Sequence, residues 1–118
     1  MKPHLLDRVR AALWALRTVR SARRQLRAGT PVDELRLRAL PDLPVEAAGG
    51  VRRVVRGLDG TCLERAVVLQ RWHAAHGDPR ALLIGVTTPS SGFRAHAWLE
   101  GEEPGEAEFT TLARYEAP

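Results

Sequence analysis

The first part of the chain shows a helical spacing of apolar residues. Over residues 4–28 apolar positions recur at three- and four-residue steps, and arginines occupy most of the remaining positions. The apolar positions are Leu5, Val9, Ala12, Leu13, Leu16 and Val19. Gly29 follows, and glycine is the usual residue just past a helix C-terminus. The pattern predicts one amphipathic helix over residues 4–28.

Two shorter helices are expected next. Thr30 is a suitable N-cap, Pro31 suits the first helical position, and Asp33 completes a capping box. This pattern predicts a helix that ends at about Leu40, ahead of a proline. A third helix is expected over residues 45–57, although two adjacent glycines weaken its first half.

The strongest local helix signal covers residues 61–76. Thr61 is expected to cap this helix and Glu64 to complete the capping box, because they are three residues apart. Leu63, Val67 and Trp72 contribute to its apolar face. The glycine and proline that follow predict its end.

Strands are predicted in the remainder of the chain. Residues 81–88 form an apolar run, residues 93–100 alternate, and residues 107–112 are rich in β-forming side chains. Turn residues separate the three segments, over 89–92 and 101–105. Helices followed by a small antiparallel sheet predict an α+β fold.

Composition and charge narrow the class of protein. The chain has 118 residues, 44% of them apolar, which suits a single domain over residues 1–118. Residues 1–56 carry 13 Lys+Arg against 5 Asp+Glu, whereas residues 57–118 carry 5 against 9. A basic first half suits an acidic peptide, a partner protein, nucleic acid or a membrane surface.

Several partners and compartments are disfavoured. Aromatic residues make up only 5% of the chain, no DNA-binding motif is recognisable, and the second half is acidic, so we expect no nucleic-acid partner. No apolar run approaches the roughly 20 residues of a membrane span, so no membrane partner is expected. A single cysteine and the lack of a secretory signal favour the cytoplasm.

Cys62 and His96 are the candidate catalytic residues. Cys62 stands in the first turn of a predicted helix, where unpaired N–H groups and the helix dipole favour a thiolate and could hold an oxyanion. His96 lies in the middle of a predicted strand. The alternatives are a small buried cysteine and a structural histidine. His73 and His76 have a metal-ligand spacing without a convincing third ligand, so we expect no metal and no cofactor.

A histidine base usually needs a third group to orient its ring. Glu106 and Glu108 share a face of the predicted third strand, and a hairpin pairing would bring them within reach of His96. Asp59, three residues before Cys62, is a further candidate.

Four segments carry a resemblance to a known family. They are residues 61–66 (TCLERA), 84–86 (IGV), 92–100 (GFRAHAWLE) and 109–112 (FTTL). With these segments the chain resembles the transglutaminase-like superfamily, which is related to papain-type cysteine peptidases. More narrowly, it is similar to the leader peptidases of lasso-peptide biosynthesis, the B2 proteins. The resemblance covers roughly residues 50–115.

The resemblance implies a function and a set of partners. Cys62 would be the nucleophile and His96 the base, and Glu106 aligns with the third position, where the family usually has aspartate. Such proteins cut a ribosomally made precursor between leader and core. A leader-binding B1 protein grips the leader, and a separate lasso cyclase then closes the ring. Residues 1–57 would then be a basic docking part and residues 58–118 the catalytic core.

Three other functions stay open. A non-catalytic adaptor could keep the same fold and only present the precursor. A transglutaminase would use the same residues to join acyl groups to amines. A basic nucleic-acid-binding protein is the alternative from another class, because the pI is near 10.5.

Overall fold

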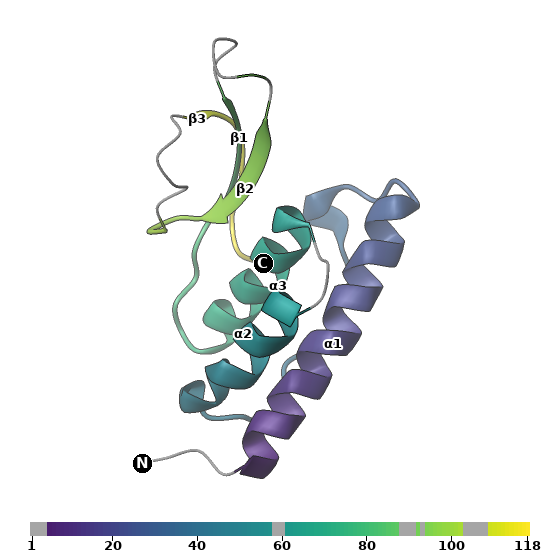
Figure 1. Ribbon diagram of the computed structural model, residues 1–118, viewed down its shortest axis with the longest axis vertical. Helices are drawn as coiled ribbons and strands as arrows, with labels where there is room; N and C mark the ends of the chain where they lie inside the picture. The colour runs from purple at the N-terminus through teal and green to yellow at the C-terminus, as the bar shows by residue number, and fades with distance from the viewer. Residues whose placement is uncertain (1–4, 58–60, 88–91, 93, 103–108) are drawn as a thin grey trace.

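The computed structural model describes residues 5–57, 61–87, 92, 94–102 and 109–118. Three α-helices precede a three-stranded antiparallel sheet, which confirms the predicted α+β class (Figure 1). The helices are α1 (Leu5–Arg27), α2 (Ala48–Gly57) and α3 (Cys62–Ala75). The strands are β1 (Leu82–Thr87), β2 (Ala95–Leu99) and β3 (Phe109–Tyr115). None of the helices in this part of the chain is both long and apolar enough to cross a bilayer.

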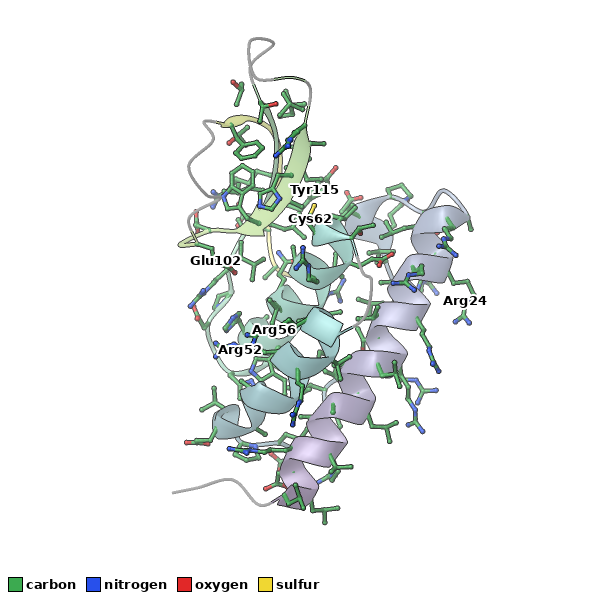
Figure 2. The ribbon with its side chains drawn as sticks, in the orientation of Figure 1. Arg24, Arg52, Arg56, Cys62, Glu102 and Tyr115 are labelled. Atoms are coloured by element: carbon green, nitrogen blue, oxygen red, sulfur yellow. The ribbon has the colours of Figure 1, made fainter. Side chains whose placement is uncertain are left out.

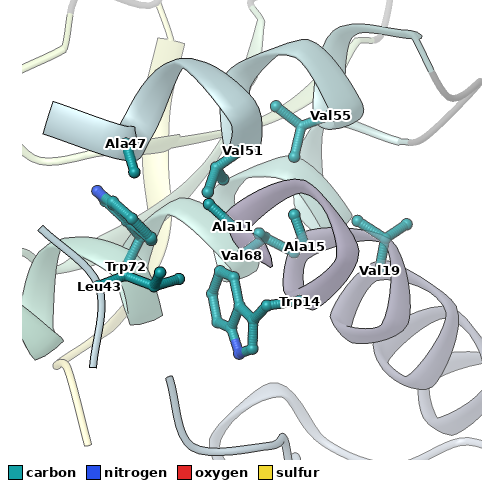
Figure 3. Packing of buried hydrophobic residues seen from close by; sticks show 10 residues of the cluster. All are labelled: Ala11, Trp14, Ala15, Val19, Leu43, Ala47, Val51, Val55, Val68 and Trp72. Carbon is teal, nitrogen blue, oxygen red and sulfur yellow. The ribbon is translucent and has the colours of Figure 1, made fainter. Parts of the chain in front are cut away.

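The three helices share one apolar core. The apolar face predicted for α1 is largely wrong: of its six positions only Val19 is buried, whereas Leu5, Val9 and Leu13 are exposed. The side of α1 that packs against α2 and α3 carries Trp14 and small side chains. The buried residues of the core come from all three helices and the segment before α2 (Figure 3). They are Ala11, Trp14, Ala15, Val19, Leu43, Ala47, Val51, Val55, Val68 and Trp72. Burial of one side of α1 stabilises this 23-residue helix, and its exposed positions carry arginines together with Leu5, Val9 and Leu13.

The helix predicted over residues 30–40 is wrong. The structure has only a 3-10 turn, Val32–Glu34, and Leu35 after it is extended, with φ −63° and ψ 131°. The Gln25 side chain of α1 explains the difference, because its amide accepts from the Arg36 N–H at 2.9 Å and donates to the Arg36 carbonyl at 2.8 Å. These contacts hold the segment extended along α1 and outweigh the local helix signals.

The helix predicted over residues 45–57 is confirmed, with a 3-10 turn, Val45–Ala47, ahead of α2. Its adjacent glycines are Gly49, which is exposed, and Gly50, which faces α1. A Cβ at Gly50 would lie 2.4 Å from the carbonyl oxygen of Arg8. Gly50 therefore permits the close approach of the two helices.

A second core joins α3 to the sheet. Ala66 and Val67 of α3 are buried with Leu82 of β1 and with Ala97 and Leu99 of β2. The other side of α3 contributes to the helical core. Helix α3 is therefore the element that fixes the sheet to the helices.

The strand order is β2-β1-β3, and both pairings are antiparallel. The expected pairing of the third strand with the histidine strand is wrong, because β3 pairs with β1 instead. The apolar β1 segment takes the central position, where both of its edges are hydrogen-bonded. β2 is consequently an edge strand, and β3 continues past the predicted end at Leu112 to Tyr115, which packs on the second core.

Candidate active site

The start of α3 places Cys62. The hydroxyl oxygen of Thr61 accepts from the Glu64 N–H at 3.1 Å, and the Glu64 carboxylate accepts from the Thr61 N–H at 3.1 Å. This is the predicted capping box, and it makes Cys62 the first residue of the helix. The remaining first-turn N–H groups and the helix dipole favour negative charge at this end.

A salt bridge with α1 supports the capping box. The Arg23 guanidinium donates to both carboxylate oxygens of Glu64 at 3.0–3.2 Å, and Glu64 is only 5% exposed. Burial by itself raises the pKa of Glu64. The hydrogen bonds from Arg23 and Thr61 and the charges of Arg23 and Arg27 outweigh burial, so its pKa lies below the ordinary 4.5. A charged Glu64 therefore links α1 to the residue before Cys62.

The Cys62 sulfur lies at the free edge of β2. The backbone N–H of Ala97 donates to Sγ at 3.4 Å. A pocket of about 210 Å³ follows this edge. Its lining includes Cys62, Arg65, Leu69, His96, Trp98 and Glu102. Figure 2 shows Cys62 at the first turn of α3 and Glu102 beyond the end of β2.

His96 belongs to an aromatic cluster on the outer face of the sheet. Its ring stacks on Trp98, with centroids 5.8 Å apart and an interplanar angle of 16°, and lies 5.3 Å from the Phe109 ring. Gly85 pairs with His96 in the sheet, and a Cβ there would lie 2.9 Å from the Trp98 ring. The glycine therefore leaves room for this cluster.

Cys62 and His96 reach the same pocket from opposite sides of β2. Side chains alternate along a strand, so His96 faces away from α3 whereas Ala97 faces toward it. Cys62 and His96 both belong to the part of the chain that the structure describes, and no hydrogen bond joins the sulfur to the imidazole. The donor to the sulfur is the Ala97 N–H. The structure thus gathers the two candidates in one pocket, and their catalytic contact stays a prediction.

The three candidate third groups, Glu106, Glu108 and Asp59, lie outside the described residues. Glu102 is a carboxylate at the pocket that was not predicted from the sequence. Its only sequence signal is its place just after the histidine strand. Gly85 and Phe109 lie in segments that carry the family resemblance, but their packing around His96 was not predicted. A glycine inside an apolar strand was the available signal for close packing.

The two histidines with metal-ligand spacing have separate partners. His73 Nδ1 lies 3.8 Å from Asp78, while the ring nitrogens of His76 lie 2.8 Å from the Trp72 carbonyl and 2.9 Å from the Leu43 carbonyl. Burial and the charge of Arg80 lower the pKa of His73. Within the described residues, no three His, Cys, Asp or Glu side chains are grouped to hold a metal ion.

An α+β fold that presents a cysteine at a helix start beside a histidine-bearing strand has the layout of a cysteine-based acyl-transfer domain. Comparison with protein families identifies the particular family: the model described as the core of the transglutaminase-like superfamily matches residues 5–116. The chain therefore belongs to the transglutaminase-like superfamily. Comparisons with curated proteins and with solved structures gave no match.

Proposed function

We propose that this protein is a cysteine peptidase that removes the leader from a ribosomally made lasso-peptide precursor, together with a leader-binding partner protein. The observation that carries the proposal is the Cys62 sulfur at the start of a capped helix, in one pocket with His96. Family membership supports the cysteine chemistry, and the lasso-peptide resemblance of residues 92–100 supports the substrate. The basic face of α1 suits a peptide or protein partner.

In the proposed reaction, His96 accepts the thiol proton and the Cys62 thiolate attacks the last carbonyl of the leader. The Ala97 N–H donates to the sulfur at 3.4 Å and so orients the Cys62 side chain at the pocket. In this proposal the first-turn amides of α3, those of Cys62 and Leu63, hold the oxyanion. The C–N bond then breaks, and the imidazolium proton goes to the core amine. Water cleaves the thioester, releasing the leader as a carboxylic acid and returning a proton to sulfur.

The mechanism requires one movement of the histidine. The imidazole stacks on Trp98 on the outer face, so it must turn around the free edge of β2 to approach the sulfur. In the described part of the sheet, no strand pairs with the outer edge of β2. Catalytic hydrogen bonds often form only when substrate is bound, which is consistent with this requirement.

The separation of the sulfur and the imidazole also favours a second candidate function. A non-catalytic adaptor would keep the fold and the pocket and would present the precursor without cutting it. In that case His96 would serve only to pack against Trp98 and Phe109.

Mass spectrometry of the precursor, incubated with this protein and the leader-binding partner, distinguishes the two functions. The peptidase predicts leader release by the wild type, none by Cys62→Ala, and at least a hundredfold slower release by His96→Ala. Equal release by wild type and Cys62→Ala would overturn the proposal. Precursor binding without release by any form would establish the adaptor.

A further inference from the structure

The first turns of α1 carry an apolar surface that the described chain does not cover. Leu5 is 77% exposed, Leu6 67%, Val9 54% and Leu13 44%. Isolated apolar residues are ordinary on a protein surface, but four on one stretch of helix form a patch. This patch lies at the end of α1 away from the sheet (Figure 1).

Part of the patch forms the wall of a groove, which we call the α1–α2 groove. Its volume is about 390 Å³, and its apolar lining is Leu5, Val9 and Ala12 of α1 with Val54 of α2. The close approach at Gly50 fixes the two walls relative to each other. The groove is therefore a preformed recess for apolar side chains.

The rim of the α1–α2 groove is basic. Arg8 and Arg53 line it, and both side chains are exposed and make no ion pair or hydrogen bond within the described residues. Arg52 and Arg56 extend the positive charge along α2, where Figure 2 labels them. An apolar recess with unpaired guanidinium groups at its rim is complementary to an apolar segment flanked by carboxylates.

We propose that the α1–α2 groove binds an acidic segment of the leader-binding partner, whose apolar side chains insert beside Val9 and Val54 while its carboxylates pair with Arg8 and Arg53. The identity of the partner rests on the proposed function; the chemistry of the segment rests on the groove. A second copy of this chain fits less well, because a symmetric contact would bring arginines together. A flat lipid surface would not fill a recess between two helices.

A partner bound in the α1–α2 groove would lie away from the Cys62 thiol. Arg23, beside the start of α3, lies 14 residues along α1 from Val9, which corresponds to about 21 Å of helix rise. An extended peptide covers that distance with roughly six or seven residues. The docked partner would therefore leave the pocket at Cys62 open to the leader–core junction.

The test measures binding on the Cys62→Ala background, so that it does not depend on cleavage. The probe is the purified leader-binding partner carrying the precursor, and its Kd is measured by calorimetry. Arg8→Glu/Arg53→Glu should raise the Kd at least tenfold. The matched control, Arg17→Glu/Arg20→Glu, makes the same charge change elsewhere on α1 and should stay within threefold. Val9→Asp should also weaken binding at least tenfold.

Three other binding results would overturn the groove proposal. Equal weakening by the groove pair and the control pair would show that net charge alone attracts the partner. Unchanged binding in all variants would place the partner elsewhere on the molecule, and no binding by the parent would rule out a docked partner. Binding of the parent to phosphatidylglycerol vesicles but not to the partner would assign the patch to lipid. If the groove variants weaken binding as expected but the wild type releases no leader, the proposed peptidase function is contradicted and the groove proposal stands.

Discussion

At the residue scale, Gly85 determines the arrangement of rings around His96. The Trp98 ring occupies the space that a side chain at position 85 would take. Phe109 closes the same cluster from the other edge strand, 5.7 Å from Trp98 and 5.3 Å from His96. The alternation predicted over residues 93–100 places His96 and Trp98, two residues apart, on one face, and their stacking confirms it.

Gly85→Ala should disturb this cluster. The new Cβ would lie 2.9 Å from both the Trp98 ring and the Thr110 carbonyl oxygen, so the strand or the indole must shift. Overpacking of this kind costs about 1–3 kcal/mol, measurable as a lower free energy of unfolding in urea. The NMR signals of the His96 ring should move while those of His76 stay in place. Unchanged stability and unchanged His96 signals would contradict this account of Gly85.

At the element scale, the Arg23–Glu64 salt bridge connects α1 to the start of α3. Local sequence predicted the capping role of Glu64, because Thr61 and Glu64 are three residues apart. It could not predict Arg23, since the two partners are 41 residues apart and α1 offers many arginines. The same limit explains the wrong helix over residues 30–40, where Gln25 of α1 provides the deciding contacts.

Arg23→Met should strongly destabilise the fold, because it leaves the buried Glu64 charge without its main partner. Loss of one member of a buried pair costs about 3–5 kcal/mol. The matched control is Arg24→Met, which removes an exposed arginine from the next position and should change stability by no more than about 0.5 kcal/mol. Urea denaturation at pH 7 measures both. Equal losses in the two variants would contradict a special role for Arg23.

The effect of Arg23→Met should depend on pH. Because the folded-state pKa of wild-type Glu64 lies below 4.5, its stabilising contribution is present above pH 4.5 and is lost as the pH falls through the folded-state pKa. Protonated Glu64 no longer needs a cation. The difference in unfolding free energy between wild type and Arg23→Met should therefore shrink as the pH is lowered from 7 to 3. A constant difference would contradict this explanation.

The packing of α1 on α2 allows a comparison of adjacent glycines. Gly50→Ala places a Cβ 2.4 Å from the Arg8 carbonyl oxygen, and backbone cannot give way cheaply, so a loss of about 2 kcal/mol or more is expected. Gly49→Ala meets nothing within 4 Å and should leave stability unchanged or slightly higher. Thermal unfolding distinguishes the two, and equal melting temperatures would show that the helices are not held at this contact.

At the scale of the whole molecule, the functional parts are spread along an elongated shape. The molecule measures 48 × 31 × 26 Å, with the sheet at one end and the first turns of α1 at the other (Figure 1). The Cys62 pocket adjoins the sheet, whereas the α1–α2 groove lies at the far end. This arrangement suits a protein that receives its substrate from a docked partner.

The isolated chain should therefore cut the precursor slowly or not at all. Addition of the leader-binding partner should raise the initial rate of leader release at least tenfold, because the partner raises the local concentration of the leader. Chromatography of timed samples measures the rate. Efficient processing by the purified chain alone would contradict partner dependence.

The parts of the site that could be predicted from the sequence are those set by local patterns, whereas contacts between residues far apart in the sequence could not be predicted. Cys62 and His96 were selectable because the capping box and the alternating strand are local patterns. Their positions on opposite sides of β2 were not, since those depend on β1 taking the centre of the sheet. The contributions of Phe109 and Glu102 likewise require the assembled fold.

The most direct test of the central claim is to trap the acyl-enzyme. The wild-type protein, its partner and the precursor are mixed, quenched in acid on a millisecond-to-second scale, and analysed by intact-mass spectrometry and peptide mapping. The account predicts a transient adduct with the mass of the leader less one water, located on Cys62. Leader release without any adduct on Cys62, at a rate that Cys62→Ala leaves unchanged, would contradict it.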